Sequence, residues 1–298
     1  MTQPNGGEKA LLFGGLPEAY LDTWEITSDL DLVTERLDVA FESVPNAELA
    51  ERYLNATPAE RALTARLIAD MLADVDTRTA SPMPPLSGIE KAVRLYVVMD
   101  TMREARGCDA VSIVCRPWIE DPGAPVPCTA LMMFQENGIP AACQGDLDAL
   151  LTMILFRRIG AQTTFMGGAH LGHQHLSISH CALARTVAGD SLQTYEIQDY
   201  HGHKASPTVR THVPIGETVT LARLTKSLDS LLLTTGTVKG EGRTPRACTN
   251  ALLIEVNNRN RVINAVNGPQ NHYVLAWGDR SYELATEARS YGIPIVYL

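Results

Sequence analysis

All eight histidines of this 298-residue chain lie in its second part, after residue 125. Because histidine is the side chain whose ordinary pKa lies closest to neutrality, this concentration indicates where proton transfer or metal binding takes place. His170, His173 and His175 fall within six residues, and imidazoles so spaced could bind Zn²⁺ or Mn²⁺ together with His272. On an extended strand, however, His173 and His175 would share one face and His170 would lie on the other. A polar surface loop is therefore the alternative interpretation.

A second concentration of reactive side chains is the run 199–204, which holds Asp, Tyr, His and Lys. An aspartate can orient an imidazole as a base, a tyrosine can donate to a developing oxyanion, and a lysine can bind an anionic group. We take His201 and Lys204 as candidate catalytic residues and Tyr200 as a candidate substrate ligand. Gly202 at the centre of the run is equally typical of a polar hairpin connection.

Asp146 is a further candidate general base. The Asp-Leu-Asp sequence at 146–148 is also typical of a helix start, in which the Asp146 carboxylate caps the helix that begins at Leu147. The two roles are compatible with each other.

The six cysteines form no C-x-x-C pair and are expected to be reduced thiols. Cys181 follows His180, but adjacent residues on a strand point to opposite faces of a sheet. These two side chains are therefore not expected to form a thiolate–imidazole dyad, and Cys181 is predicted to be a buried structural cysteine.

The elements that position these residues divide the chain near 125. Residues 1–125 alternate helices with short buried strands, which predicts an α/β domain. A proline-rich stretch follows, and most of residues 126–298 then consist of short strand-like runs separated by Gly, Asn and Pro, which predicts a β-rich domain, a barrel or a sandwich. In this second part the patterns predict helices at 129–137, 147–159 and 281–290, and strands at 139–143, 218–224, 230–235, 252–256, 273–277 and 293–298.

Composition excludes several classes of function. The net charge of −9 argues against a nucleic-acid partner, because such binding releases counterions through clustered Lys and Arg. The longest apolar stretch, 150–156, is far shorter than the ~18 residues of a membrane span. The start of the chain has neither a basic segment nor an apolar segment long enough for export, so we expect a cytoplasmic protein with no membrane partner.

Four blocks in the second part of the chain resemble, in order and spacing, the L-fucose (D-arabinose) isomerase family. They are GIPAACQGD at 138–146, SHC at 179–181, GETVTLARL at 216–224 and NHYVLAWGD at 271–279. The resemblance implies the last two domains of a fucose isomerase, an α/β domain followed by a barrel-like β-rich domain. The family's further N-terminal domain is expected to be absent.

The resemblance also implies a site. Those isomerases interconvert an aldose and a ketose through an enediol held on a divalent metal, usually Mn²⁺, whose ligands are a Glu, an Asp and a His. In this sequence Gln144 stands in place of the Glu and Gly167 stands near the place of the Asp, so His272 alone matches. A carboxamide is a poor ligand for a hard cation and glycine offers no side chain. The family's Mn²⁺ site is therefore expected to be absent or weak, with Gln144 and Asn271 hydrogen-bonding to substrate.

The sequence thus predicts a sugar-isomerase-like enzyme that transfers a proton on a polyhydroxylated or sugar-derived small molecule. Its catalytic residues would be His272, Asp146, His201 and Lys204. The alternatives are a metal-independent lyase, epimerase or cyclase in the same pocket, and a non-catalytic sugar-binding or assembly protein. Because neighbouring chains complete each site in the resembling family, a homo-oligomer is expected.

Overall fold

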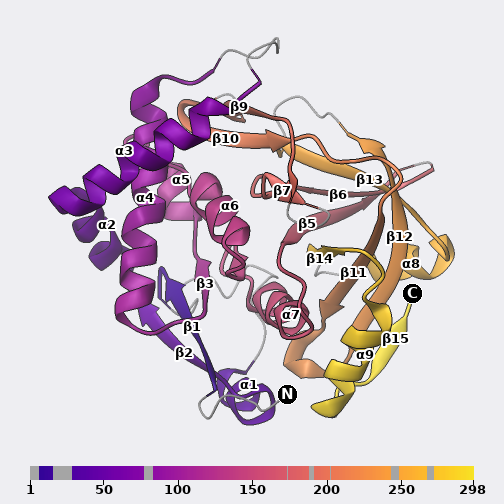
Figure 1. Cartoon of the computed structure of the whole chain (residues 1–298). Coiled ribbons are helices and arrows are strands. Elements are labelled where there is room, and N and C mark those ends of the chain that lie inside the picture. The colour runs from indigo at the N-terminus through magenta and orange to yellow at the C-terminus, as the bar shows by residue number, and fades with distance from the viewer. Residues whose placement is uncertain are drawn as a thin grey trace.

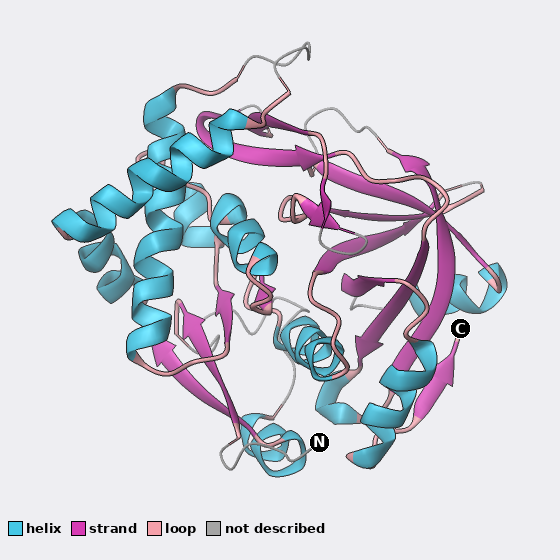
Figure 2. Cartoon of the chain, in the orientation of Figure 1, coloured by secondary structure: helices cyan, strands magenta, loops and turns pink. Residues whose placement is uncertain are grey.

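The chain forms a parallel α/β sheet followed by a closed β-barrel (Figure 1). The structure is a computed structural model that describes residues 7–15, 29–76, 83–172, 174–187, 191–201, 203–242, 248–266 and 272–298. Most of the helices gather around the parallel sheet, and the largest sheet is the barrel (Figure 2). Within the described ranges no helix is both long enough and apolar enough to cross a membrane.

The parallel sheet has the strand order β2-β1-β3-β4, and its central strands are almost completely buried. Helix α3, one of the helices around this sheet, shows how the local sequence determines where a helix begins. The Thr57 side chain accepts a hydrogen bond from the Glu60 amide and the Glu60 carboxylate accepts one from the Thr57 amide, which together form a capping box. The elements are β1 (Glu8–Phe13), α1 (Leu30–Leu37), β2 (Val39–Val44), α2 (Asn46–Leu54), α3 (Pro58–Ala73), α4 (Leu86–Ala105), β3 (Ala110–Ile113), α5 (Arg116–Glu120), α6 (Cys128–Glu136) and β4 (Ala141–Ala142).

The α/β sheet continues beyond the boundary expected at residue 125. Strand β4 pairs in parallel with β3, and the next helix, α7 (Leu147–Arg158), contacts both of these strands. The opposite side of α7 contacts barrel strands β11 and β14, so the helix lies between the sheet and the barrel (Figure 1). The first ten residues of α7 are therefore buried on every side. The exact division of the chain into domains stays a prediction.

The barrel is closed because β11 pairs with both β14 and β12. Its order is β11-β14-β5-β6-β13-β12 and back to β11, with β15 added in parallel along β12. Along β14, Tyr273, Leu275 and Trp277 belong to one apolar cluster with the other barrel strands, while Val274 and Ala276 pack in the cluster that contains α7. The barrel elements are β5 (Thr164–Leu171), β6 (Leu176–His180), β11 (Thr218–Leu224), β12 (Leu231–Glu241), β13 (Asn250–Val256), β14 (His272–Trp277) and β15 (Ile295–Tyr297).

A two-stranded hairpin, β9 (Tyr195–Tyr200) and β10 (His203–Thr211), links the two parts. Strand β10 contacts α4 and α6, and the Asn250 side chain at the start of β13 bonds to the Thr211 amide at 3.0 Å and the Val209 carbonyl at 2.9 Å. The predicted hairpin connection at 199–204 is confirmed. The remaining elements are β7 (Thr186–Val187), β8 (Ser191–Leu192), a short 3₁₀ turn (Lys226–Leu228), α8 (Arg259–Val266) and α9 (Ser281–Ser290).

Candidate functional site

The centre of the candidate site is a hydrogen bond between two buried side chains, Asp146 and His272. Asp146 caps α7, where its Oδ1 accepts a hydrogen bond from the Ala149 amide at 2.8 Å. Its Oδ2 lies 2.9 Å from Nδ1 of His272, the first residue of β14. The cap expected from the sequence is confirmed, and the same carboxylate also orients an imidazole.

The backbone between β4 and α7 explains why these groups meet. Gln144 and Gly145 both have positive φ, 60° and 69°, which turns the chain sharply before Asp146. A non-glycine residue in this conformation is strained, and such strain concentrates at functional sites. The turn leaves Gln144 exposed while Asp146 is fully buried. In the barrel, His272 pairs with Gly168 of β5. Gly167, which stands near the place of the aspartate ligand in the resembling family, therefore lies next to the strand partner of His272. Gln144, which stands in place of the glutamate ligand, lies in the turn itself.

Arg223 of β11 supplies positive charge to the pair. Its guanidinium is buried, donates to the backbone carbonyl of His272, and lies 3.9 Å from Asp146 Oδ2 and 4.0 Å from Asp148 Oδ2. Burial alone would raise the pKa of Asp146, but the hydrogen bond from His272 and the charge of Arg223 outweigh it and hold the pKa below its usual value. Asp146 is therefore a carboxylate at neutral pH.

A second imidazole, His180, lies beside His272. The two ring centroids are 5.5 Å apart and the rings meet edge to face. Burial lowers the pKa of His180 to about 3, with a further contribution from the charge of His272. His180 is therefore neutral at physiological pH.

The lowered pKa of His180 predicts how the stability of the protein depends on pH. Between pH 6.5 and pH 3 the unfolded chain binds a proton at His180 that the folded chain does not, so the free energy of unfolding falls as the pH is lowered through this range. Each pH unit is worth at most about 1.4 kcal/mol, so the free energy should be about 2 kcal/mol lower at pH 5 than at pH 7 from this residue alone. Urea unfolding of the wild type and of His180→Asn at both pH values measures the effect. An identical pH dependence in the two proteins would show that His180 does not cause it.

The residue after His180, Cys181, belongs to a second group of side chains, which consists of thiols and one imidazole. Cys181 Sγ lies 3.5 Å from His201 Nε2, and the potential ligand atoms of Cys181, His201 and Cys248 all lie within 4.8 Å of one another. Cys128 packs against Cys181 in the same apolar cluster. The hydrogen bond to Cys128 and burial raise the pKa of Cys181, so it is not an activated nucleophile.

Sequence reasoning missed this cluster because its members come from distant segments. Cys181 directly follows β6 and Cys248 precedes β13, and these strands are antiparallel neighbours with Asn250 opposite His180. The strand pairing brings the two cysteines together, and no local spacing reveals it. The expectation that Cys181 is buried, and that it forms no dyad with its neighbour His180, agrees with the structure, in which the imidazole that contacts it is His201.

The other sequence candidates lie in several places. His170 is exposed on β5 and His175 is half-buried before β6, and in the described part of the chain neither forms a ligand group with His272, which is buried. His170 and His175 therefore do not form with His272 the metal site that the sequence offered as one of two interpretations. Tyr200 and His201 stack with their ring centroids 4.1 Å apart at the tip of the hairpin. His173, Asn271 and the side chain of Lys204 lie outside the described residues.

The residues around His272 do not fit the Mn²⁺ of the resembling family. A Cβ added at Gly167 would lie 2.8 Å from Ile178 Cγ2 and 3.0 Å from the Ser179 backbone, so an aspartate there would require the strands to shift. Gln144 offers a carboxamide, and both oxygens of Asp146 already accept hydrogen bonds. Hard cations need several oxygen ligands, and this set does not provide them.

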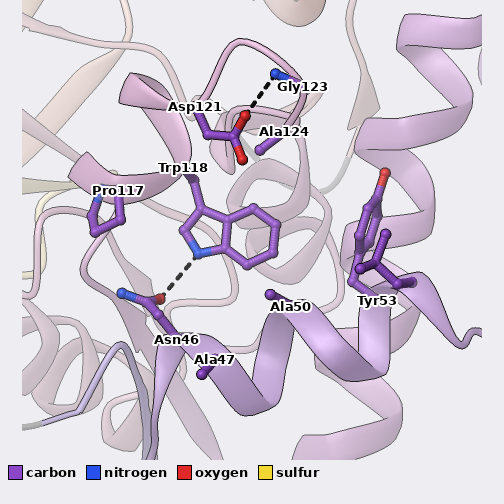
Figure 3. Close-up of a pocket in the computed structure, with 10 residues that line it drawn as sticks. Asn46, Ala47, Ala50, Tyr53, Pro117, Trp118, Asp121, Gly123 and Ala124 are labelled. Carbon is purple, nitrogen blue, oxygen red and sulfur yellow. Dashed lines mark hydrogen bonds between the residues drawn. The ribbon is translucent and has the colours of Figure 1, made fainter.

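A separate pocket of about 500 Å³ opens between α2 and α5 in the α/β part (Figure 3). Trp118 forms one wall, with its Nε1 donating to Asn46 Oδ1 at 3.0 Å and its ring edge-to-face with Tyr53. Asp121 lines the same pocket. An apolar aromatic wall with a few polar groups is typical of a small-molecule site, and no sequence motif had marked it.

Comparison with known proteins gives one informative relation. No family model matches the chain. The chain is 25% identical over 200 residues to a sulfoquinovose isomerase from Clostridium sp. (strain MSTE9), a match that covers 64% of this chain and 42% of that enzyme. The match thus spans less than half of the relative's length. The chain is similar to a sugar isomerase, which supports the class of family inferred from the sequence blocks, while the L-fucose/D-arabinose assignment stays a prediction.

Proposed function

We propose that this chain is a sugar-isomerase-like enzyme that moves a proton on the carbon next to the carbonyl group of a polyhydroxylated or sugar-derived substrate. The proposal is carried by the buried Asp146–His272 hydrogen bond of 2.9 Å in a chain similar to a sugar isomerase. His272 is the base and Asp146 orients it. The family's Mn²⁺ has no part in this proposal.

The electrostatics of the pair suit this role. The ionised Asp146 favours the tautomer of His272 that carries its proton on Nδ1, which places the basic lone pair on Nε2. In an aldose–ketose conversion the base takes the proton from C2 and a proton is delivered to C1, while a hydroxyl proton moves from O2 to O1. The neutral His180 beside His272 can donate a hydrogen bond to one of these oxygens.

Gln144, Tyr200 and Asn271 would bind the substrate. Gln144 is exposed at the strained turn before Asp146, where its carboxamide can hydrogen-bond a hydroxyl group. Tyr200 and Asn271 keep the substrate contacts proposed for them from the sequence, and Lys204 stays a candidate catalytic residue. His201, the other catalytic candidate of the hairpin, has its Nε2 3.5 Å from Cys181 Sγ and is not given a substrate contact.

Solvent deuterium exchange tests the proposal without knowledge of the product. The protein is incubated in D₂O with aldoses that include L-fucose, D-arabinose and sulfoquinovose, and the loss of the C2 proton signal is followed by NMR. An isomerase or epimerase exchanges this proton. A protein that only binds sugars shows saturation in ligand titrations with no exchange above the buffer rate, and that result would refute the proposal.

A further inference from the structure

We propose that Cys181, Cys248 and His201 bind Zn²⁺. This site is distinct from the Asp146–His272 pair, and the inference does not depend on the proposed isomerase chemistry. Its starting point is that the three potential ligand atoms lie within 4.8 Å of one another although their residues are far apart in the sequence.

The fold holds each ligand from a different segment. Cys181 follows β6, Cys248 precedes the neighbouring strand β13, and His201 sits in the turn between β9 and β10. The His201 backbone has φ of 45°, a left-handed conformation that is costly for a non-glycine residue. With this backbone the imidazole stacks on Tyr200 and places Nε2 3.5 Å from Cys181 Sγ. Strain that directs a ligand atom into a cluster indicates a functional constraint.

The donor set selects the metal. Thiolate and imidazole ligands suit Zn²⁺, which binds sulfur at about 2.3 Å and nitrogen at about 2.0 Å in a tetrahedron. Ligand atoms at those distances are separated by roughly 3.5 Å, which matches the spacing between Cys181 and His201. Mn²⁺, Mg²⁺ and Ca²⁺ prefer oxygen ligands, and the three ligands offer none.

Cys128 lies beside the three ligands, outside the group whose ligand atoms fall within 4.8 Å of one another, and would become the fourth ligand by a shift of its side chain. It opens α6, is buried, and hydrogen-bonds with Cys181 within an apolar cluster that also holds Val126. A zinc ion with four protein ligands is a structural site. Because Cys128 belongs to a helix that packs on the α/β part and the other ligands belong to the barrel and hairpin, the ion would fasten these parts together.

Elemental analysis tests the site on the full chain, purified under reducing conditions and dialysed against metal-free buffer after loading with zinc. The wild type should retain about one Zn²⁺ per chain, whereas Cys181→Ser, Cys248→Ser and His201→Asn should each lose it. Cys108→Ser is the matched control, because Cys108 is an equally buried thiol in the α/β part, outside the cluster. Cys128→Ser should weaken binding at least tenfold in competition with a chelator.

Two further measurements distinguish a loss of metal binding from a loss of the folded structure. Co²⁺ in place of zinc should give thiolate-to-cobalt charge-transfer absorption in the wild type and in Cys108→Ser, and not in Cys181→Ser. His201 lies in a half-buried turn, so His201→Asn should keep the wild-type circular dichroism spectrum while losing the metal. A wild type that retains no zinc, zinc that survives in both Cys181→Ser and Cys248→Ser, or a Cys181–Cys248 disulfide in the purified protein would overturn the proposal.

Discussion

His272→Asn should reduce the rate of C2 deuterium exchange by a factor of about 100 or more. The asparagine amide can still donate a hydrogen bond to Asp146 Oδ2, which the imidazole approaches at 2.9 Å. It cannot accept a proton from carbon, because a carboxamide is not a base. The melting temperature should therefore change little while exchange is lost, and both are measured on the same preparation.

A matched control separates this role from a general effect of removing a histidine. His170→Asn makes the same change at an exposed position on the neighbouring strand β5, and should leave the exchange rate unaltered. If His272→Asn exchanges as fast as the wild type, or loses activity only in parallel with unfolding, His272 is not the base. His272→Ala provides the structural comparison, since it also removes the donor to Asp146 and should lower the melting temperature.

Asp146→Ala should lower the free energy of unfolding by about 4 kcal/mol. The change removes the cap of α7, worth about 1 kcal/mol. It also removes the carboxylate that faces the buried guanidinium of Arg223 and the ring of His272, and breaking one partner of a buried charge pair costs about 3–5 kcal/mol. Urea denaturation at pH 7 measures the loss.

Asp29→Ala isolates the contribution of the cap. Asp29 accepts hydrogen bonds from the amides of Asp31 and Leu32 at the start of α1, but it is exposed and caps without a buried charge partner. It should cost about 1 kcal/mol. A loss in Asp146→Ala no greater than the loss in Asp29→Ala would mean that the buried cluster adds nothing to stability.

The sequence predicted correctly those helices and strands whose ends are determined by residues close by in the chain. The strand at 218–224 and the helix at 281–290 coincide with β11 and α9, and the expected start of α7 at Leu147 follows from its aspartate cap. The strand expected at 230–235 extends in fact through Glu241 as β12. Gly236 suggested a break, but a Cβ there would lie 2.6 Å from the Glu255 carbonyl, so the glycine permits a close approach of β12 and β13.

The candidate site was only partly predictable, because its geometry depends on pairings between distant strands. Asp146 and His272 were selected by their types and by resemblance, yet their contact requires α7 to lie against β14. Arg223 was not selected, since an arginine within a strand has no local signal of burial. The thiol cluster required the pairing of β6 with β13 and the placement of the hairpin over both, neither of which any short window of sequence contains.

The insertion of β14 between β5 and β11 determines the order in which the protein can be assembled during synthesis. Strand β5 ends at Leu171, but the strand that covers its edge begins only at His272, near the end of the chain. While the ribosome makes the intervening residues, β5 and β11 each carry an open edge able to pair with other chains. Asp146 and Arg223 likewise lack their hydrogen bonds to His272 until that residue has been synthesised. A nascent chain therefore gains its closed barrel and its Asp146–His272 hydrogen bond in the same late step, and ribosome stalling before residue 272 would leave an aggregation-prone intermediate.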